Sequence, residues 1–385
     1  MNAVVPCTSN VSIGPQRFVV VYAIEGNEEQ ARTRAIDLCY EQTVEFPETL
    51  VPERLIREGV VGRLDSLDRR DERSFLAAVS FAGDAATGDL TQWLNMVMGN
   101  TSLKPGIRVE RIDLGPTAAA FRGPRFGRAG LRELLGVFDR PLLCTALKPM
   151  GLPVGDLADL AYRFASGGID LIKDDHGLAD QRFCRFEDRV SHCAAAVARA
   201  NRETGLRCRY LPNVTAGPDQ MPRRATFAKD CGAGGLLMSP GLCGFEAMRQ
   251  LADDDVLALP ILSHPAFQGG FIASPNSGFS HHALFGQIPR LAGADATIFP
   301  NFGGRFSFSR EDCIALAAGT GAPMAGIRPI FPVPAGGMSV AQVHELAAAY
   351  GSELIILVGG GLFRAGPDLA ENCRALLQIA RQFPS

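Results

Sequence analysis

The sequence lacks several features that would each point to a particular class of protein. It has no apolar run of the roughly 18 residues needed to cross a bilayer, so no membrane-spanning helix is predicted. It has no long basic run, and its formal net charge of −3 argues against a nucleic-acid partner. The ten cysteines include no Cys-x-x-Cys pair. Several of them, such as Cys39, Cys144, Cys193 and Cys231, have the apolar neighbours typical of reduced core thiols.

The N-terminal segment Met1–Pro15 has no basic region followed by an apolar core, so we expect no secretory signal. Hydrophobic residues make up 46% and charged residues 21% of the chain, which is ordinary for a globular protein. The length of 385 residues suits one small and one large domain. The sequence therefore predicts a soluble, cytoplasmic protein.

The N-terminal third mixes strand and helix patterns. Apolar and β-branched runs predict strands, and apolar residues at helical spacing predict helices, in the order strand 17–23, helix 28–40, extended segments 60–70 and 73–81, helix 90–98 and strand 109–114. This order suggests an α+β domain of the ferredoxin-like type over residues 1–135. The loop-forming triplet Arg122-Gly123-Pro124 marks the linker.

Residues 136–385 follow a regular alternation of buried strands and amphipathic helices. The eight expected strands are 141–147, 169–173, 208–214, 235–238, 257–263, 296–299, 328–333 and 354–358. Eight strand-then-helix units of this length predict a (β/α)8 TIM barrel, with a doubly wound sheet as the alternative.

Polar side chains follow the expected strands at the edge where barrel enzymes carry their chemistry. Lys148 follows the first strand, His264 the fifth and Arg305 the sixth. The second strand runs directly into Lys173-Asp174-Asp175-His176. Alternation along a strand directs Lys173 and Asp175 to one face and Asp174 to the other. An active-site edge is predicted, and a solvated surface turn is the alternative.

Glycine clusters follow the last two strands, Gly336-Gly337 after the seventh and Gly359-Gly360-Gly361 after the eighth. Without a Cβ, their backbone N–H groups can approach an anion, and these two loops commonly hold a phosphate in barrels. Plain tight turns are the alternative reading. Two clusters at these two strands favour a phosphate site.

In this order, the motifs Lys148-Pro149, Lys173-Asp174-Asp175, His264 and the two glycine clusters resemble the ribulose bisphosphate carboxylase (RuBisCO) large-chain superfamily. The resemblance spans nearly the whole chain. Met98-Gly99-Asn100 is similar to the family's N-domain substrate-contact motif.

The resemblance implies a role for each matching residue. Lys173 would be carbamylated by CO2 and would bind Mg²⁺ together with Asp175 and the residue at position 176. Lys148 would assist proton transfer and His264 would bind substrate, and the candidates for moving the proton are Lys148, the Lys173 carbamate and His264. For His264, a strand-end histidine with no such role is the alternative. The remaining implied contacts are with substrate or its phosphate: Asn100, contributed by a partner's N-domain, Arg305 of the loop after strand six, Gly336, Gly337, Gly359 and Gly360. Glu41 is a further N-domain candidate.

The departures from the family decide the expected activity. The third metal ligand, a glutamate in carboxylases, is His176, so either the metal is softer than Mg²⁺ or His176 acts differently. Met150 stands where carboxylases have a lysine. Pro265, Ile298 and Ala335 replace an arginine, a histidine and a serine of the second phosphate site. Apolar groups cannot hold a dianion, so a single phosphate and no CO2 fixation are expected.

The resemblance therefore implies a RuBisCO-like protein that does not fix CO2. The main hypothesis is metal-dependent enolisation by an isomerase acting on a substrate like 5-methylthioribulose 1-phosphate. Alternatives are a decarboxylase of a phosphorylated 3-oxo sugar acid such as 3-oxo-isoapionate 4-phosphate, an enolase that stops at the enol, and an inactive regulatory barrel. The resemblance implies a homodimer or larger assembly without a small subunit.

Overall fold

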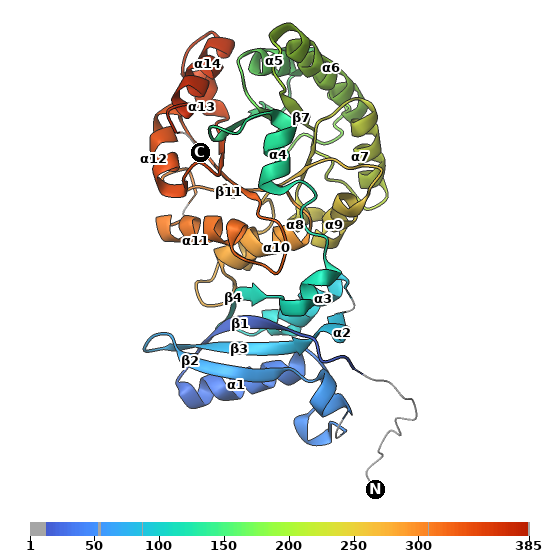
Figure 1. Ribbon diagram of the computed structural model, residues 1–385, viewed down its shortest axis with the longest axis vertical. Coiled ribbons are helices and arrows are strands. Elements are labelled where there is room, and N and C mark those ends of the chain that lie inside the picture. Colours follow the sequence, from blue (N-terminus) through green and yellow to red (C-terminus); the bar gives the residue numbers. More distant parts are fainter. Residues whose placement is uncertain (1–12, 53–54, 87, 307, 384–385) are drawn as a thin grey trace. The chain divides into compact units, whose positions relative to one another are not determined.

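A computed structural model of the chain describes residues 13–52, 55–86, 88–306 and 308–383 (Figure 1). Residues 1–12, which make up most of the segment tested for a secretory signal, lie outside this range. The chain divides into two compact units. The first consists of Met1–Phe121, Gly269–Gln287 and Pro323–Ile327, and the second of Arg122–Gln268, Ile288–Ala322 and Arg328–Ser385. Among the described residues, no helix has both the length and the apolar character that a membrane span requires.

The first unit is a five-stranded sheet with helices. Its strands are β1 (Arg17–Glu25), β2 (Arg63–Arg69), β3 (Ser74–Ala82), β4 (Ile107–Asp113) and β10 (Gly278–Phe279), and its helices α1 (Glu28–Glu41), α2 (Gly83–Ala86) and α3 (Leu90–Met98). The sheet order is β10-β4-β1-β3-β2, and the first four strands of the sequence pair antiparallel. The order 4-1-3-2 with helices after β1 and β3 confirms the ferredoxin-like arrangement.

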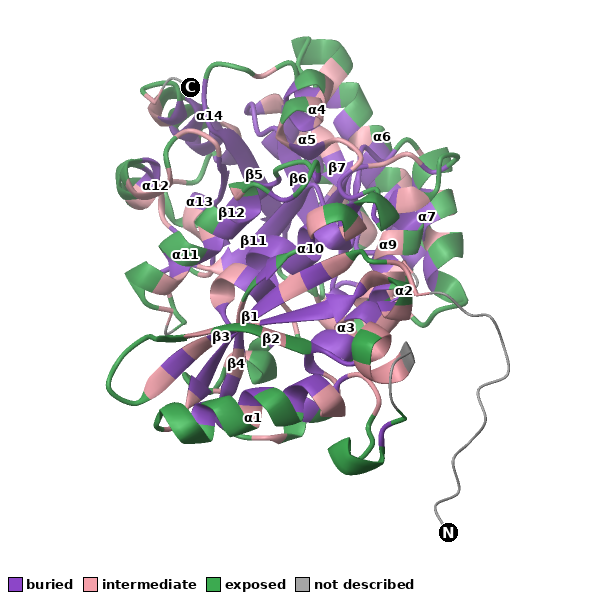
Figure 2. Cartoon of the chain, turned by 60° about the horizontal axis from the view of Figure 1, so that its bottom comes forward, coloured by how far each residue is buried: buried purple, intermediate pink, exposed green. Residues whose placement is uncertain are grey.

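The two longer helices of this unit begin at side-chain caps, as expected where backbone N–H groups lack partners. Asn27 accepts a hydrogen bond from the Gln30 N–H at 2.9 Å, and the Gln30 side chain accepts one from the Asn27 N–H at 3.0 Å. Asp89 caps α3 by accepting from the Thr91 N–H at 2.8 Å. Each helix has one face with buried residues and another that is exposed, visible for α1 in Figure 2.

The edge strand β10 was not predicted, because a two-residue strand has no readable periodicity. It lies in a segment that follows the fifth barrel strand in the sequence, and it pairs parallel with β4. The Gln287 side chain bonds both the N–H and the carbonyl of Ile112 at 2.8 Å. The Gly106 N–H donates to Ser277 Oγ at 2.8 Å. The segment Gly269–Gln287, which follows the fifth barrel strand in the sequence, thus adds the edge strand to the sheet of the first unit.

The second unit contains eight parallel strands among its described residues, in two four-stranded sheets. The first sheet has the order β13-β5-β6-β7 and the second β12-β11-β9-β8. The strands are β5 (Leu142–Leu147), β6 (Leu171–Asp174), β7 (Arg209–Leu211), β8 (Leu236–Met238), β9 (Ile261–Ser263), β11 (Ala296–Pro300), β12 (Phe331–Ala335) and β13 (Ile355–Leu357). All eight overlap the predicted strands. A bridge between Asn213 and Leu237 joins β7 to β8.

Helices alternate with the strands of this unit (Figure 1), and α4 precedes the first of these strands, β5. They are α4 (Gly127–Leu135), α5 (Val154–Ser166), α6 (Phe186–Thr204), α7 (Gln220–Asp230), α8 (Pro240–Cys243), α9 (Phe245–Asp253), α10 (Ile288–Leu291), α11 (Arg310–Gly321), α12 (Val343–Tyr350), α13 (Gly360–Arg364) and α14 (Leu369–Ala380). The alternation of strand and helix confirms the (β/α)8 barrel.

Two prolines explain why β12 and β13 are neighbours without a hydrogen-bonded ladder. The Phe331 N–H donates to the Asp295 carbonyl at 3.1 Å, and the Ala335 carbonyl accepts from Asn301, so these residues of β12 face β11. N–H groups alternate in direction along a strand, so positions 332 and 334 face the other side. Pro332 and Pro334 have no N–H to donate there. Side chains of β12 and β13 instead pack together in the apolar cluster that fills the barrel.

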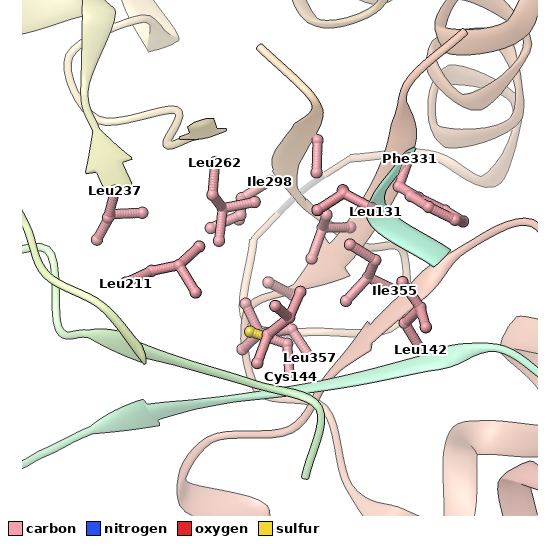
Figure 3. Close-up of a cluster of buried hydrophobic side chains, with 14 of the residues drawn as sticks. Leu131, Leu142, Cys144, Leu211, Leu237, Leu262, Ile298, Phe331, Ile355 and Leu357 are labelled. Atoms are coloured by element: carbon pink, nitrogen blue, oxygen red, sulfur yellow. The ribbon is translucent and has the colours of Figure 1, made fainter. Parts of the chain in front are cut away.

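The barrel is filled by one cluster of apolar side chains, drawn in Figure 3. Its members from the strands include Leu142, Cys144, Leu171, Leu211, Leu237, Leu262, Ile298, Phe331, Ile355 and Leu357. Leu131 and Leu135 of α4 belong to the same cluster. The division between the units follows Phe121 and not residue 135, where the sequence suggested a boundary, because α4 packs on the barrel core.

A buried ion pair anchors the entry to the barrel. Arg140 donates through Nη1 and Nη2 to the two carboxylate oxygens of Asp170, at 2.7 and 2.9 Å. The Leu143 N–H donates to the same carboxylate at 2.7 Å. Both charged side chains are 8% exposed. The pair therefore ties the segment before β5 to the start of β6.

We expect Asp170→Ala to destabilise the protein by about 3–5 kcal/mol, because it leaves the Arg140 charge buried and unpaired. Urea unfolding followed by circular dichroism measures this loss. The control is Asp255→Ala, which removes a 71% exposed carboxylate that pairs with Arg122 and Arg125 and should leave the unfolding midpoint nearly unchanged. Equal midpoints for the two variants would contradict the prediction.

Candidate active site

Five of the predicted site residues meet at the carboxyl ends of barrel strands. Lys148 follows β5, Lys173 lies in β6 with Asp175 and His176 just after it, and His264 follows β9. Lys148 Nζ lies 3.3 Å and His176 Nδ1 3.4 Å from Asp175 Oδ1. The His176 and His264 rings stack with centroids 4.5 Å apart and planes inclined by 11°. The fold thus makes one cluster of residues from three strands.

The Lys173 amine is held in a dry environment. The residue is 4% exposed, and its Nζ donates to the Asp174 carbonyl at 3.0 Å. Burial lowers the pKa of Lys173, the nearby Lys148 charge lowers it further, and Asp175 only partly opposes this. A lysine of lowered pKa is more readily present as the neutral amine, which is the form that attacks CO2 to give a carbamate.

Asp175 remains a carboxylate in spite of partial burial. Burial alone raises the pKa of Asp175, but the hydrogen bond from His176 and the charges of Lys148 and Lys173 outweigh it and hold the pKa below its usual value. An ionised carboxylate beside an imidazole can supply oxygen to a divalent cation.

His264 is neutral and has a defined tautomer. Burial, together with the charge of Lys173, lowers the pKa of His264 from 6.5 to about 2. The Ala266 N–H points at His264 Nδ1 at 3.2 Å, so Nδ1 acts as the acceptor. The ring proton therefore resides on Nε2, which makes that nitrogen a hydrogen-bond donor.

Asp174 points away from the site cluster, as strand alternation predicted. It is fully buried and accepts hydrogen bonds from Arg189 Nε at 3.1 Å, the Tyr210 hydroxyl at 2.7 Å and the Asn213 N–H at 3.0 Å. Arg189 and Tyr210 were not predicted as partners of Asp174. The available signal was the position of Arg189 on the buried face of α6, next to Val190, where a charge requires a partner.

One of the two candidate phosphate loops, the loop after β12, has a backbone that favours glycine. Gly336 and Gly337 have φ values of +95° and +102°. The Arg305 N–H donates to the Gly336 carbonyl at 2.9 Å, so the loop after β11 contacts the loop after β12. A Cβ on Gly359 would lie 3.8 Å from Lys148 Cε, and Gly360 begins α13. Both glycine clusters and Arg305 thus lie at the same end of the barrel as the lysines.

Asn100 lies in the first unit, at the start of a short 3₁₀ helix, Asn100–Leu103. Its Nδ2 donates to Glu41 Oε1 at 3.1 Å, and Lys104 Nζ lies 3.5 Å from the other Glu41 oxygen. The two N-domain candidates, Asn100 and Glu41, are therefore neighbours within this unit.

The fit of a metal ion depends on Lys173. In the described parts of the chain, no three His, Cys, Asp or Glu side chains come together as a metal site. Asp175 and His176 supply two adjacent donors, and a carbamate on Lys173 would add oxygen donors next to them. The residues therefore fit a divalent cation once Lys173 is carbamylated.

The apolar replacements differ in their surroundings. Ile298 and Ala335 belong to the cluster that fills the barrel and are 3% and 9% exposed. Met150 is half exposed and lies by the loop of Asp175, with its Sδ 3.6 Å from Gln181 Nε2. No guanidinium or imidazole stands at positions 265, 298 or 335 to bind a second phosphate.

Comparison with known proteins shows which family the chain belongs to. The catalytic-domain model of the ribulose bisphosphate carboxylase large chain matches residues 127–368. A protein of Rhodospirillum rubrum named 5-methylthioribulose-1-phosphate isomerase is 40% identical over 367 residues, covering 94% of this chain and 95% of that protein. The chain belongs to the ribulose bisphosphate carboxylase large-chain family.

Within this RuBisCO family the chain groups with the RuBisCO-like proteins, as the sequence predicted. Ribulose bisphosphate carboxylase-like protein 1 of Rhodopseudomonas palustris is 38% identical over 358 residues, which cover 93% of this chain and 95% of that protein. The crystal structure of a Rubisco-like protein from Rhodopseudomonas palustris superimposes with a TM-score of 0.85 at 34% identity, covering 96% and 99% of the two chains.

The neutral state of His264 can be observed directly by NMR of ¹⁵N-labelled histidine in the metal-free protein. We expect the His264 signals to keep the pattern of an Nε2–H imidazole from pH 8 to pH 5, because its pKa is about 2. A free histidine side chain would titrate near pH ~6.5 in this range. The spectrum of His264→Asn assigns the signals, and a His264 midpoint near the free value would contradict the prediction.

Proposed function

We propose that the protein catalyses metal-dependent enolisation of a ketose monophosphate, as an isomerase whose substrate resembles 5-methylthioribulose 1-phosphate. The observation that carries this proposal is the cluster of Lys148, Lys173, Asp175, His176 and His264 at one end of the barrel. The Rhodospirillum rubrum relative named for this activity supports the choice of substrate.

Enolisation requires a proton to leave carbon and charge to be stabilised on oxygen. The Lys148 amine, 3.3 Å from Asp175, is the candidate for moving a proton at the substrate. His264 would donate its Nε2 proton in a hydrogen bond to a substrate oxygen, because its Nδ1 is already engaged by the Ala266 N–H. Burial of Lys173 and the partly buried position of His264 strengthen electrostatic interactions in this part of the site.

Asp175, His176 and carbamylated Lys173 would hold a divalent cation, with Mg²⁺ as the expected ion. Once bound, the cation would polarise the substrate carbonyl and stabilise the charge that develops on its oxygen. The low pKa of Asp175 keeps its carboxylate available as a ligand.

Substrate phosphate would bind at Gly336, Gly337, Gly359 and Gly360, where backbone N–H groups can approach an anion without obstruction by a side chain. The apolar residues at positions 265, 298 and 335 supply no charge for a second phosphate. A substrate with one phosphate and an uncharged far end fits this distribution of charge, and ribulose bisphosphate does not.

A decarboxylase of a phosphorylated 3-oxo sugar acid is the second candidate. Loss of CO2 from such a substrate gives an enediolate of the same kind. This reaction requires a cation for the substrate carboxylate, and Arg305 is available for it because its backbone contacts Gly336 in the candidate phosphate loop. The products of the reaction distinguish this candidate from the isomerase.

Deuterium exchange tests the enolisation step. We expect ¹H NMR to detect exchange of the α-proton of 5-methylthioribulose 1-phosphate in D2O with Mg²⁺ and bicarbonate, and this exchange to fall by at least about 100-fold in Lys173→Ala. The matched control Lys229→Ala, which removes an exposed lysine of α7, should exchange at the rate of the unmodified protein. No exchange with any ketose monophosphate, with Mg²⁺, Mn²⁺ or Zn²⁺, would favour the inactive regulatory barrel.

Subunit complementation tests the contribution of Asn100. We propose a homodimer or larger assembly in which Asn100 reaches the barrel of a partner chain. Lys173→Ala and Asn100→Ala should then each be nearly inactive alone. Their mixture after subunit exchange should regain activity, because one site of each mixed dimer has both residues intact. Failure to regain activity, with mixed dimers detected by native mass spectrometry, would contradict this role.

A further inference from the structure

A buried polar network lies next to the loop that carries Asp175 and His176. Its centre is Asp174, whose carboxylate accepts three hydrogen bonds from Arg189, Tyr210 and the Asn213 N–H. Asp174 stands between Lys173 and Asp175 in the sequence. Its bonds therefore fix the backbone of β6 at the point where the candidate metal ligands begin.

The Asn213 side chain returns from the end of β7 to this loop. Its Nδ2 donates to the carbonyls of His176 and Leu178, both at 2.9 Å. Its Oδ1 accepts from the Thr215 N–H at 3.2 Å, which defines the orientation of the amide. Asn213 is 2% exposed, so water does not compete for these bonds. The Asn213 amide thus holds the carbonyls of both His176 and Leu178.

Arg189 holds the rest of the loop from α6. Its Nη2 donates to the Ala179 carbonyl at 2.8 Å and its Nη1 to the Cys184 carbonyl at 3.3 Å, while Nε bonds Asp174. Burial disfavours the charged guanidinium, but the Asp174 carboxylate outweighs it and raises the pKa of Arg189. The side chains of Arg189 and Asn213 therefore bind four carbonyl groups between residues 176 and 184, and Asp174 accepts from Arg189 Nε and from the Asn213 backbone N–H.

We propose that Asn213 and Arg189, connected by Asp174, are positioning residues that set the metal affinity of the site by holding the loop of Asp175 and His176 beside Lys173. This inference rests on the proposed function. None of the three touches the reacting atoms in this arrangement. Ligands that are fixed in advance lose less conformational freedom on binding, and removal of such supporting bonds typically costs about 10- to 100-fold in metal affinity.

The test compares two isosteric variants, Asn213→Asp and Asn372→Asp. Asn372, in α14, also donates through Nδ2 to two backbone carbonyls, those of Leu362 and Gly366 at 2.8 and 2.9 Å, but it holds a different loop. Electron paramagnetic resonance of Mn²⁺ at saturating bicarbonate gives the Kd for the metal. Thermal unfolding of the same samples gives the loss of stability.

We expect Asn213→Asp to raise the Mn²⁺ Kd by about 10- to 100-fold, while Asn372→Asp loses a similar amount of thermal stability and keeps the Kd of the unmodified protein. An unchanged Kd in folded Asn213→Asp overturns the inference and leaves the proposed function standing. Absence of saturable Mn²⁺ binding in the unmodified protein overturns both.

If Asn213→Asp does not fold, Asn213→Ser replaces it. Serine removes the bonds to both carbonyls without placing a negative charge beside them. The Kd is then compared in the same way, with Asn372→Ser as the matched control. A raised Kd in Asn213→Ser alone supports the inference, and equal Kd values in the two serine variants overturn it.

Discussion

The strict alternation of side chains along β6 is the constraint on which the site depends. Lys173 and Asp175 face the site, and Asp174 between them must face the helices. A carboxylate on that side would be costly without partners, and Arg189, Tyr210 and Asn213 supply them. The placement of Lys173 and Asp175 on one side of β6 thus depends on the hydrogen bonds that Asp174 makes on the other side.

Burial gives the site much of its chemical character. Burial lowers the pKa values of the Lys173 amine and the His264 imidazole, because charge is disfavoured away from water. Asp175 keeps its charge because His176 and two lysines lie beside it. A lysine and a histidine of lowered pKa and an ionised carboxylate therefore lie close together. This combination suits proton transfer and cation binding at neutral pH better than three ordinary surface groups would.

The lack of charged side chains at positions 265, 298 and 335 also bears on the choice of substrate. The resemblance to carboxylases implies a second phosphate site at Pro265, Ile298 and Ala335, and the last two of these pack into the barrel core. A site of this kind can bind only one strongly charged end of a substrate tightly. The fold matches that of a Rubisco-like protein, and the apolar residues at these three positions support the proposal of a substrate with one phosphate.

The sequence by itself determined the two architectures and the strand ends at which the candidate site residues lie, because hydrophobic periodicity and glycine loops are local signals. It could not reveal β10, whose two residues have no period, or the packing of α4 on the barrel core. Only the tertiary structure brought Arg189 and Asn213 to Asp174 and stacked His176 on His264. These contacts join residues far apart in the sequence, so their burial, partners and pKa values exist only once the barrel has closed.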